Sequence, residues 1–177
     1  MFRLPILKYL FIICVSAAAF TVQANAESRE ADQKLKEAVA LSNENKNADA
    51  ISMLKELAQK FSDDRRILVS LGFVYQKENR LDDAIETFEK ALLLKQDRKV
   101  CYSLGFLYEA KAANSPSPED KKAFLNKALS AWEKVLELPS KKTVSGETEK
   151  TDNSRKSEVA AKHIEKIKSF LDSPSAQ

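Results

Sequence analysis

The sequence holds few side chains of the kinds that carry catalysis or bind metals. It has one histidine, His163, and two cysteines, Cys14 and Cys101. It contains no Cys-x-x-Cys pair, no Cys-x-x-Cys-His haem attachment sequence, no glycine-rich phosphate loop and no Gly-x-Ser-x-Gly segment. A metal site needs several ligands of suitable geometry, so His163 is interpreted as a packing or surface residue. We therefore expect a protein that is not an enzyme and has no cofactor and no metal.

Residues 1–26 have the pattern of a secretory signal peptide. Arg3 and Lys8 give a basic start, residues 9–20 form an apolar run, and residues 24–26 are Ala-Asn-Ala, which suits a signal peptidase. A membrane-spanning helix needs about 20 apolar residues, so the run favours cleavage over anchoring. The predicted location is the bacterial periplasm. The alternative is a protein anchored in the membrane by an uncleaved segment.

The residues after the signal are nearly neutral. Cleavage removes Arg3 and Lys8 from the 29 basic residues and none of the 26 acidic ones, which leaves a formal charge of +1. This balance argues against a nucleic-acid partner. Only Cys101 remains, so no intramolecular disulfide can form. Cys101 is interpreted as a packed core residue, with a mixed disulfide to a partner as the alternative.

Internal repetition determines the expected fold. Residues 70–75 and 103–108 agree at five of six positions at a spacing of 33. At a spacing of 34, Glu44-Asn45-Lys46 and Asp49-Ala50-Ile51 return as Glu78-Asn79-Arg80 and Asp83-Ala84-Ile85. Such periods indicate stacked units that bury their apolar faces against neighbours. No proline occurs between Pro5 and Pro116, which favours helices.

Apolar residues recur at helical spacing on both sides of Asn79. One stripe is Leu68, Leu71, Gly72 and Tyr75, and the other is Leu81, Ala84, Ile85, Phe88 and Leu92. Asn45 and Asn79 suit the left-handed conformation that ends a helix, and Asp82 is expected to cap the next helix.

This pattern resembles the tetratricopeptide repeat, a 34-residue helix-turn-helix unit. Residues 65–98 match its signature at Leu71, Gly72, Tyr75, Ala84, Phe88 and Ala91. Residues 31–64 match more loosely, at Ala38, Leu41, Ala50, Leu54 and Leu57. Leu68 and Gln96 occupy the positions where the family usually has Trp and Pro. The resemblance implies an all-α fold, an α-solenoid of about three such units with a C-terminal capping helix.

The third unit, residues 98–139, is expected to have two lengthened helices. It keeps Leu104, Gly105 and Tyr108, but Ala128, Trp132 and Val135 arrive 11 residues late. Residues 114–118 should end the first helix, and Ser117 before Pro118 should begin a second that runs to about Leu138. Trp132 aligns with Phe88, which predicts a core residue, and Gly72 and Gly105 are expected to let helices approach closely.

The rest of the chain is expected to cap this array. The predicted division is a signal peptide at 1–26, a repeat domain at 27–139, a flexible linker at 140–155, an amphipathic capping helix at 156–172 and a tail at 173–177. The linker is predicted from its single aliphatic residue, Val144. The capping helix is predicted from the stripe of Ala160, Ile164, Ile167 and Leu171.

In proteins of the family that this chain resembles, the first helices of the units line a concave groove. Alignment places the following residues on that surface: Leu35, Val39, Arg66, Val69, Phe73, Gln76, Lys77, Lys99, Tyr102, Phe106 and Glu109. Phe73 and Phe106 are interpreted as anchors for a peptide, and the alternative is that both rings pack between helices. Family members that grip a chaperone C-terminus use a clamp of Lys, Asn, Asn, Lys and Arg. Only Lys99 survives at the equivalent positions here, so a carboxylate fork is not expected.

The predicted function is protein binding as a scaffold, adaptor or assembly factor of the cell envelope. The partner is a protein or peptide, with no nucleic acid, and with membrane contact only if the signal stays uncleaved. The alternative is a self-assembling subunit, a homo-oligomer that uses the lengthened third unit and the final helix.

If residues 1–26 form a cleaved signal, the exported protein should begin at Glu27. N-terminal sequencing of the protein recovered from the envelope would check this. Recovery in the membrane fraction with residues before Ala26 retained would instead indicate an anchored protein.

Overall fold

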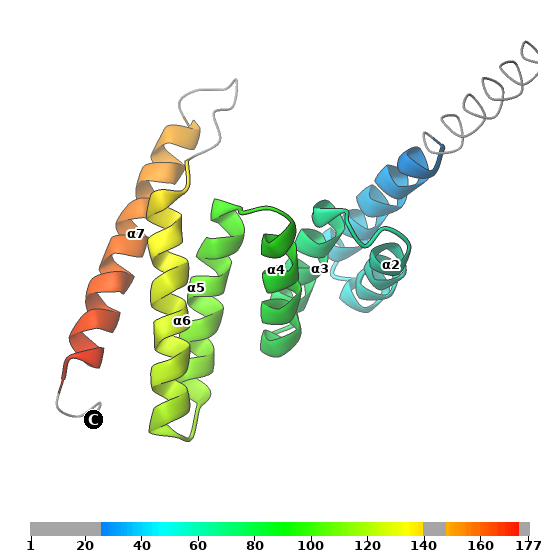
Figure 1. The fold of residues 1–177 in the computed structure, drawn as a ribbon. Coiled ribbons are helices and arrows are strands. Elements are labelled where there is room, and N and C mark those ends of the chain that lie inside the picture. Colours follow the sequence, from blue (N-terminus) through cyan, green and yellow to red (C-terminus); the bar gives the residue numbers. More distant parts are fainter. Residues whose placement is uncertain (1–25, 140–147, 174–177) are drawn as a thin grey trace, which may run out of the picture. The chain divides into compact units, whose positions relative to one another are not determined.

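The computed structural model describes residues 26–139 and 148–173 (Figure 1). The predicted signal peptide lies outside these residues except for Ala26, and so do residues 140–147 of the predicted linker. Every regular element in the described ranges is an α-helix, which confirms the all-α fold. The chain divides into two compact units, Met1–Ser62 and Asp63–Gln177.

The first unit contains a helical hairpin. Residues 26–43 are helical, and α2 spans Asn47–Lys60. Asn45 lies between them with a φ of 61°, as predicted, and Lys46 N donates to Leu41 O at 2.9 Å. This left-handed residue ends the first helix and lets the chain reverse within a few residues. The core of this hairpin includes the fully buried side chains Ala38, Ala50 and Leu54.

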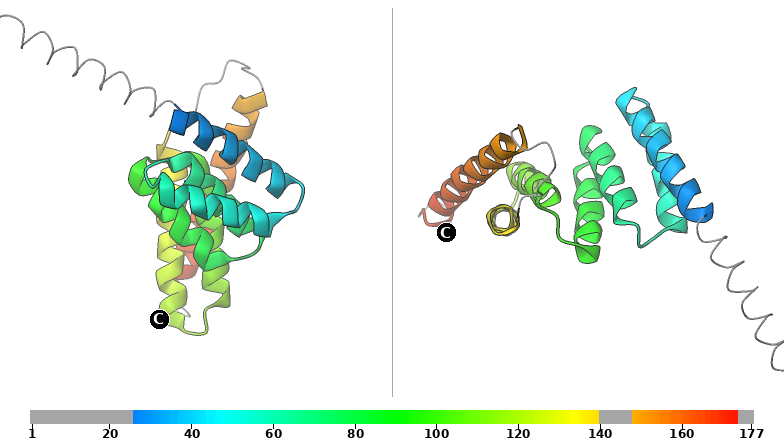
Figure 2. Two further views of the ribbon diagram at one scale, coloured as in Figure 1. Left: turned by 90° about the vertical axis from the view of Figure 1, so that its right-hand side faces the viewer. Right: turned by 90° about the horizontal axis from the view of Figure 1, so that it is seen from above.

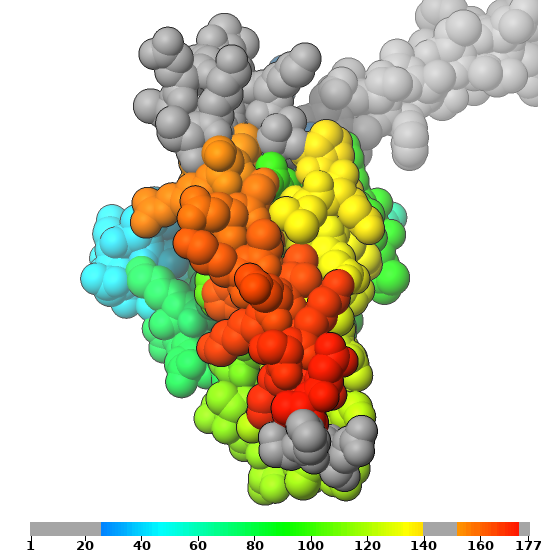
Figure 3. All heavy atoms as spheres, turned by 90° about the vertical axis from the view of Figure 1, so that its left-hand side faces the viewer, coloured from blue at the N-terminus to red at the C-terminus, as the bar shows by residue number. Residues whose placement is uncertain are grey.

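The described residues of the second unit form five helices. They are α3 (Arg65–Lys77), α4 (Leu81–Leu94), α5 (Arg98–Asn114), α6 (Pro118–Glu137) and α7 (Thr148–Leu171). Helix α3 packs against α4, α5 packs against α6, and α7 lies along α6 (Figures 1 and 2). Figure 3 shows the outer side of α7 facing away from this contact. Helices α5 and α6 have 17 and 20 residues, against 13 and 14 in α3 and α4.

Each hairpin of this unit closes on a contact between a glycine and an aromatic ring. A Cβ atom placed on Gly72 would lie 2.5 Å from Cε1 of Phe88, and one on Gly105 would lie 2.4 Å from Cε2 of Trp132. Phe88 and Trp132 have no exposed surface, which confirms that Trp132 is a core residue. The missing side chain of glycine is therefore what admits the ring between the two helices.

From the end of α3 to the start of α6, the predicted helix ends agree with the structure except at Asp82. Asn79 has a φ of 55°, as predicted, and Arg80 N donates to Tyr75 O at 2.9 Å. Asp82 is not the cap of α4, because the carbonyl of Arg80 already accepts from Ala84 N at 3.0 Å and the cap is Arg80. Asp82 lies in the first turn, where its carboxylate pairs with Lys111 at 2.7 Å.

Three other caps use acceptor side chains. Ser117 caps α6 as predicted, with Pro118 as the first helical residue, and its Oγ accepts from Asp120 N at 3.3 Å. Asp64 caps α3 and Asp97 caps α5, 33 residues apart, which the sequence patterns above did not single out. Asp97 also accepts from the guanidinium of Arg65 at 2.9 Å, which joins the starts of the two helices.

Helix α7 begins at Thr148, so residues 148–155 are helical although the sequence predicted a linker over 140–155. The prediction rested on a lack of apolar residues, but polar contacts hold this end of the helix. Nη2 of Arg98 donates to Asn153 O at 3.2 Å and to Ser157 Oγ at 2.6 Å. Among the side chains of α7 that the structure describes, from residue 152 onward, the buried ones are Ala160 and Ile167.

The glycine contact yields a test of packing. Replacing Gly105 by Ala should raise helix propensity by about 1 kcal/mol. It should nevertheless lower the free energy of unfolding by about 1–3 kcal/mol in total, because the Trp132 ring must move. Urea unfolding of Gly105→Ala, alone and combined with Trp132→Leu, would measure both effects.

The loss caused by Gly105→Ala should be smaller in the Trp132→Leu background, where the ring is absent. An alanine at position 105 that leaves the protein equally or more stable would contradict the close approach.

Candidate functional site

Nine of the eleven predicted groove residues lie on two helices of the second unit. Five lie on α3 and four on α5, and we call this set the α3–α5 face: Arg66, Val69, Phe73, Gln76, Lys77, Lys99, Tyr102, Phe106 and Glu109. The two helices are linked at this face because Nζ of Lys99 lies 4.7 Å from the centroid of the Phe73 ring. The other two predicted residues, half-buried Leu35 and the 40% exposed Val39, belong to the helix at residues 26–43 in the first unit.

Each of the two predicted anchor rings packs against a buried aromatic ring. Phe73 is half-buried and meets the edge of Phe88 at a centroid distance of 5.0 Å and an interplanar angle of 72°. Phe106 is 37% exposed and meets Trp132 at 4.8 Å and 88°. Edge-to-face contacts of this kind are favourable. Each ring is therefore fixed from below by a buried aromatic residue while part of it stays accessible.

Glu109 joins three helices of the second unit. Its Oε1 accepts a hydrogen bond from Trp132 Nε1 at 2.6 Å and lies 2.7 Å from His163 Nδ1. The His163 ring stacks on Trp132 at 4.8 Å and 27°, and it meets the edge of Phe106 at 5.0 Å. Glu109 was predicted to face a ligand, but here its carboxylate ties α5 to α6 and α7. No local sequence pattern links it to a histidine 54 residues away.

The cationic residues of the face differ in their partners. Nη2 of Arg66 is 2.7 Å from Oδ2 of Asp64, and hydrogen bonds from Arg66 lower the pKa of that carboxyl. Lys99 is exposed and forms no ion pair with any residue that the structure describes. Its ammonium rests over Phe73, a cation–π contact. Lys99 is therefore a cation of this face that has no acidic partner among the described residues.

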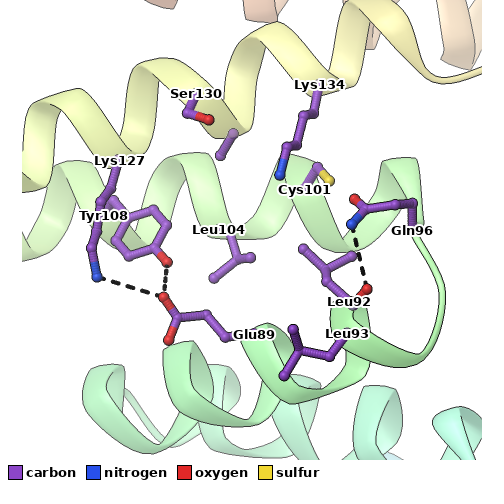
Figure 4. Close-up of a pocket in the computed structure, with 11 residues that line it drawn as sticks. Glu89, Leu92, Leu93, Gln96, Cys101, Leu104, Tyr108, Lys127, Ser130 and Lys134 are labelled. Atoms are coloured by element: carbon purple, nitrogen blue, oxygen red, sulfur yellow. Dashed lines mark hydrogen bonds and ion pairs between the residues drawn. The ribbon is translucent and has the colours of Figure 1, made fainter.

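A cavity lies between the two helical hairpins of this unit. It has a volume of about 460 Å³ and lies between α4, α5 and α6 (Figure 4). We call it the α4–α6 pocket; its lining includes Leu92, Leu93, Cys101, Leu104, Tyr108 and Lys134. Sequence patterns did not reveal it, because it depends on the spacing between hairpins.

Cys101 forms part of the inner wall of this pocket and belongs to the core. Its thiol is free and its side chain has no exposed surface. Burial raises the pKa of the Cys101 thiol, which disfavours the reactive thiolate. The interpretation of Cys101 as a packed core residue therefore fits the geometry better than a mixed disulfide with a partner.

In the ranges 26–139 and 148–173, no group of three or more His, Cys, Asp or Glu side chains is arranged to hold a metal ion. No helix in these same ranges is both long and apolar enough to cross a membrane.

Comparison with known proteins supports the repeat fold. Residues 41–104 match the family model described as Tetratricopeptide repeat. The type III secretion translocator chaperone SycD of Yersinia enterocolitica is similar with a TM-score of 0.62 at 17% identity, over 80% of this chain and 86% of SycD. The same chaperone in complex with a peptide of the translocator YopD gives a TM-score of 0.60 at 18% identity, over 80% and 94% of the two chains. Comparison with curated protein sequences gives no match.

A eukaryotic protein has a similar fold. The Sgt2 TPR domain from Aspergillus fumigatus gives a TM-score of 0.50 at 17% identity, over 82% of this chain and 85% of that domain. Identities this low carry information about the fold and not about the ligand.

The His163 contacts can be tested with the single tryptophan of the chain as a probe. Replacing His163 by Ala removes the stacked ring from Trp132 and the contact with Glu109, and should lower the free energy of unfolding by about 1–2 kcal/mol. The emission of Trp132 should shift to longer wavelength as water reaches the indole.

Lys162→Ala is the matched control, because the neighbouring Lys162 is exposed and pairs only with Glu158 on its own helix. It should leave both readings nearly unchanged. Equal stability of the two variants would show that α7 does not depend on His163.

Proposed function

We propose that this chain, a tetratricopeptide repeat protein over residues 41–104, is a protein-interaction module that binds a peptide segment of a partner along the α3–α5 face. The observation that carries the proposal is the repeated arrangement of Phe73 and Phe106. Each ring is held edge-on by a buried aromatic side chain and remains partly accessible. A ring that is fixed before binding loses little conformational freedom when a ligand covers it.

The chemistry of the face favours an apolar ligand with scattered acidic groups. Phe73, Tyr102 and Phe106 supply rings for apolar side chains, and Lys99 supplies a cation without a carboxylate partner among the described residues. A single cation of this kind can orient a ligand, whereas a fork for a terminal carboxylate needs several donors. In the similar chaperone SycD, the solved complex contains a translocator peptide, which supports a peptide ligand by analogy of fold.

The cellular role we propose is that of a scaffold, adaptor or assembly factor exported to the bacterial cell envelope. This part rests on the sequence of residues 1–26, whose pattern is that of a secretory signal. Contact with the membrane is expected only if that segment stays uncleaved.

A second candidate function is self-assembly. The structure leaves Leu94 43% exposed at the end of α4 and Leu136 47% exposed near the end of α6, and such residues can pack against another copy. Light scattering of the exported protein separates the two functions. A monomer at micromolar concentration fits a binding module, and a concentration-dependent dimer fits self-assembly.

The peptide-binding proposal predicts where a partner can be captured. A photoreactive phenylalanine analogue at position 106, activated in intact cells, should cross-link a partner, because the ring is 37% exposed on the α3–α5 face. The same analogue at Lys90, an exposed position on α4, is the control and should capture much less. Equal capture at both positions, or none at 106, would contradict the proposal.

Once the partner is captured, Phe73→Ala and Phe106→Ala should each weaken its binding by on the order of 2 kcal/mol. The same substitutions should cost less folding stability than this, because both rings are partly exposed. Calorimetric binding and thermal melts would measure the two effects. A loss of folding stability of about 3 kcal/mol or more in both variants would mean that the rings are core residues.

A further inference from the structure

The α4–α6 pocket has apolar walls and lies apart from the α3–α5 face. Its inner wall is formed by Cys101 and Leu104 of α5, and Leu92 and Leu93 of α4 form the opposite wall (Figure 4). The face described above uses Tyr102 and Phe106, which lie on another side of α5. A cavity of about 460 Å³ falls within the size range of ligand pockets in proteins, roughly 300–1,000 Å³. The pocket is large enough for one or two aliphatic side chains.

The charged groups at one end of the pocket pair with each other, whereas the charged group at the other end has no partner among the described residues. At one end, Glu89 accepts a hydrogen bond from the Tyr108 hydroxyl, and Nζ of Lys127 lies 3.6 Å from the same carboxylate (Figure 4). At the other end, half-buried Lys134 points toward Cys101 (Figure 4). Its ammonium makes no hydrogen bond or ion pair with any residue of the described ranges.

An ammonium group beside apolar walls loses part of its hydration without gaining a counterion. A carboxylate brought by a ligand would offset that loss, because a charge pair is stronger where water is partly excluded. Lys127 and Lys134 are seven residues apart on α6, a distance of about 10 Å along the helix. One short segment can therefore reach from the apolar middle of the pocket to Lys134.

The open rim of the pocket favours a polypeptide over a lipid. Leu93 is 87% exposed, so much of an acyl chain lying against it would remain in water. A partner segment needs to place only one or two side chains in the pocket, and its backbone continues beyond the rim.

We propose that the α4–α6 pocket is a second protein-docking site, which receives a partner segment that carries an aliphatic side chain within one helical turn of an Asp or Glu carboxylate. The aliphatic group packs between Leu92, Leu93 and Leu104, and the carboxylate pairs with Lys134. This site does not depend on the proposed function of the α3–α5 face, and it allows the chain to hold two segments at once.

The test uses two matched probes and the exported protein from Glu27 to Gln177. One is a 12-residue capped helical peptide with two leucines four positions apart and a glutamate three positions after the second leucine. The other has lysine in place of that glutamate. Binding is followed by the methyl NMR signals of Leu92, Leu93 and Leu104. The variants are Lys134→Glu and, as the control, Lys122→Glu, which makes the same charge change at an exposed position of α6 outside the pocket.

The acidic peptide should shift these methyl signals and bind at least about fivefold tighter than the basic one. Lys134→Glu should reverse that preference, and Lys122→Glu should leave it unchanged. Leu93→Ser should weaken both peptides, and because this side chain is 87% exposed the variant should keep its fold.

Several results would contradict the proposed docking site. They are equal binding of the two peptides, absence of binding by either at about 1 mM, and methyl shifts confined to Val69 of the α3–α5 face. Binding of dodecanoate but of neither peptide would assign the pocket to a lipid. A dimer whose formation depends on Leu93 would assign it to a second copy of the chain.

Discussion

The contact between a glycine on the first helix of a hairpin and an aromatic ring on the second determines the geometry of the 63–177 unit. Gly72 receives Phe88, and Gly105 receives Trp132, at distances that no Cβ atom would permit. Close packing of this kind fixes the position of the ring between the two helices, because a ring without free space cannot rotate away. Both buried rings then meet, edge-on, the phenylalanine one residue after each glycine. The buried rings of Phe88 and Trp132 thus hold Phe73 and Phe106 in place on the proposed binding face.

The final helix extends this arrangement by polar contacts more than by apolar burial. Of its described side chains only Ala160 and Ile167 are buried hydrophobic residues, while Arg98 and Glu109 of α5 both bond to it. The His163 ring packs against both Trp132 and Phe106.

Helix α5 serves two surfaces at once. Tyr102 and Phe106 face one side, and Cys101, Leu104 and Tyr108 line the pocket on another. The sides alternate because a helix turns about 100° per residue, so neighbours in sequence separate in space. Burial and the hydrogen bond to Glu89 raise the pKa of Tyr108, so its hydroxyl stays a donor and Glu89 keeps a local partner. Lys134 is the group of this pocket that is left for an external charge.

The sequence by itself determined the features that arise within a short stretch of chain. The repeat period, the left-handed turns at Asn45 and Asn79, the start of α6 at Ser117 and the core role of Trp132 all follow from local spacing and side-chain type. The two caps at Asp64 and Asp97 are also local, and their spacing of 33 was a signal available in the sequence. Tertiary structure alone decided three other features. These are the helical state of residues 148–155, the binding of Glu109 to His163, and the pocket around Lys134. Each of them depends on groups far apart in sequence, whose distance is set only when the helices pack.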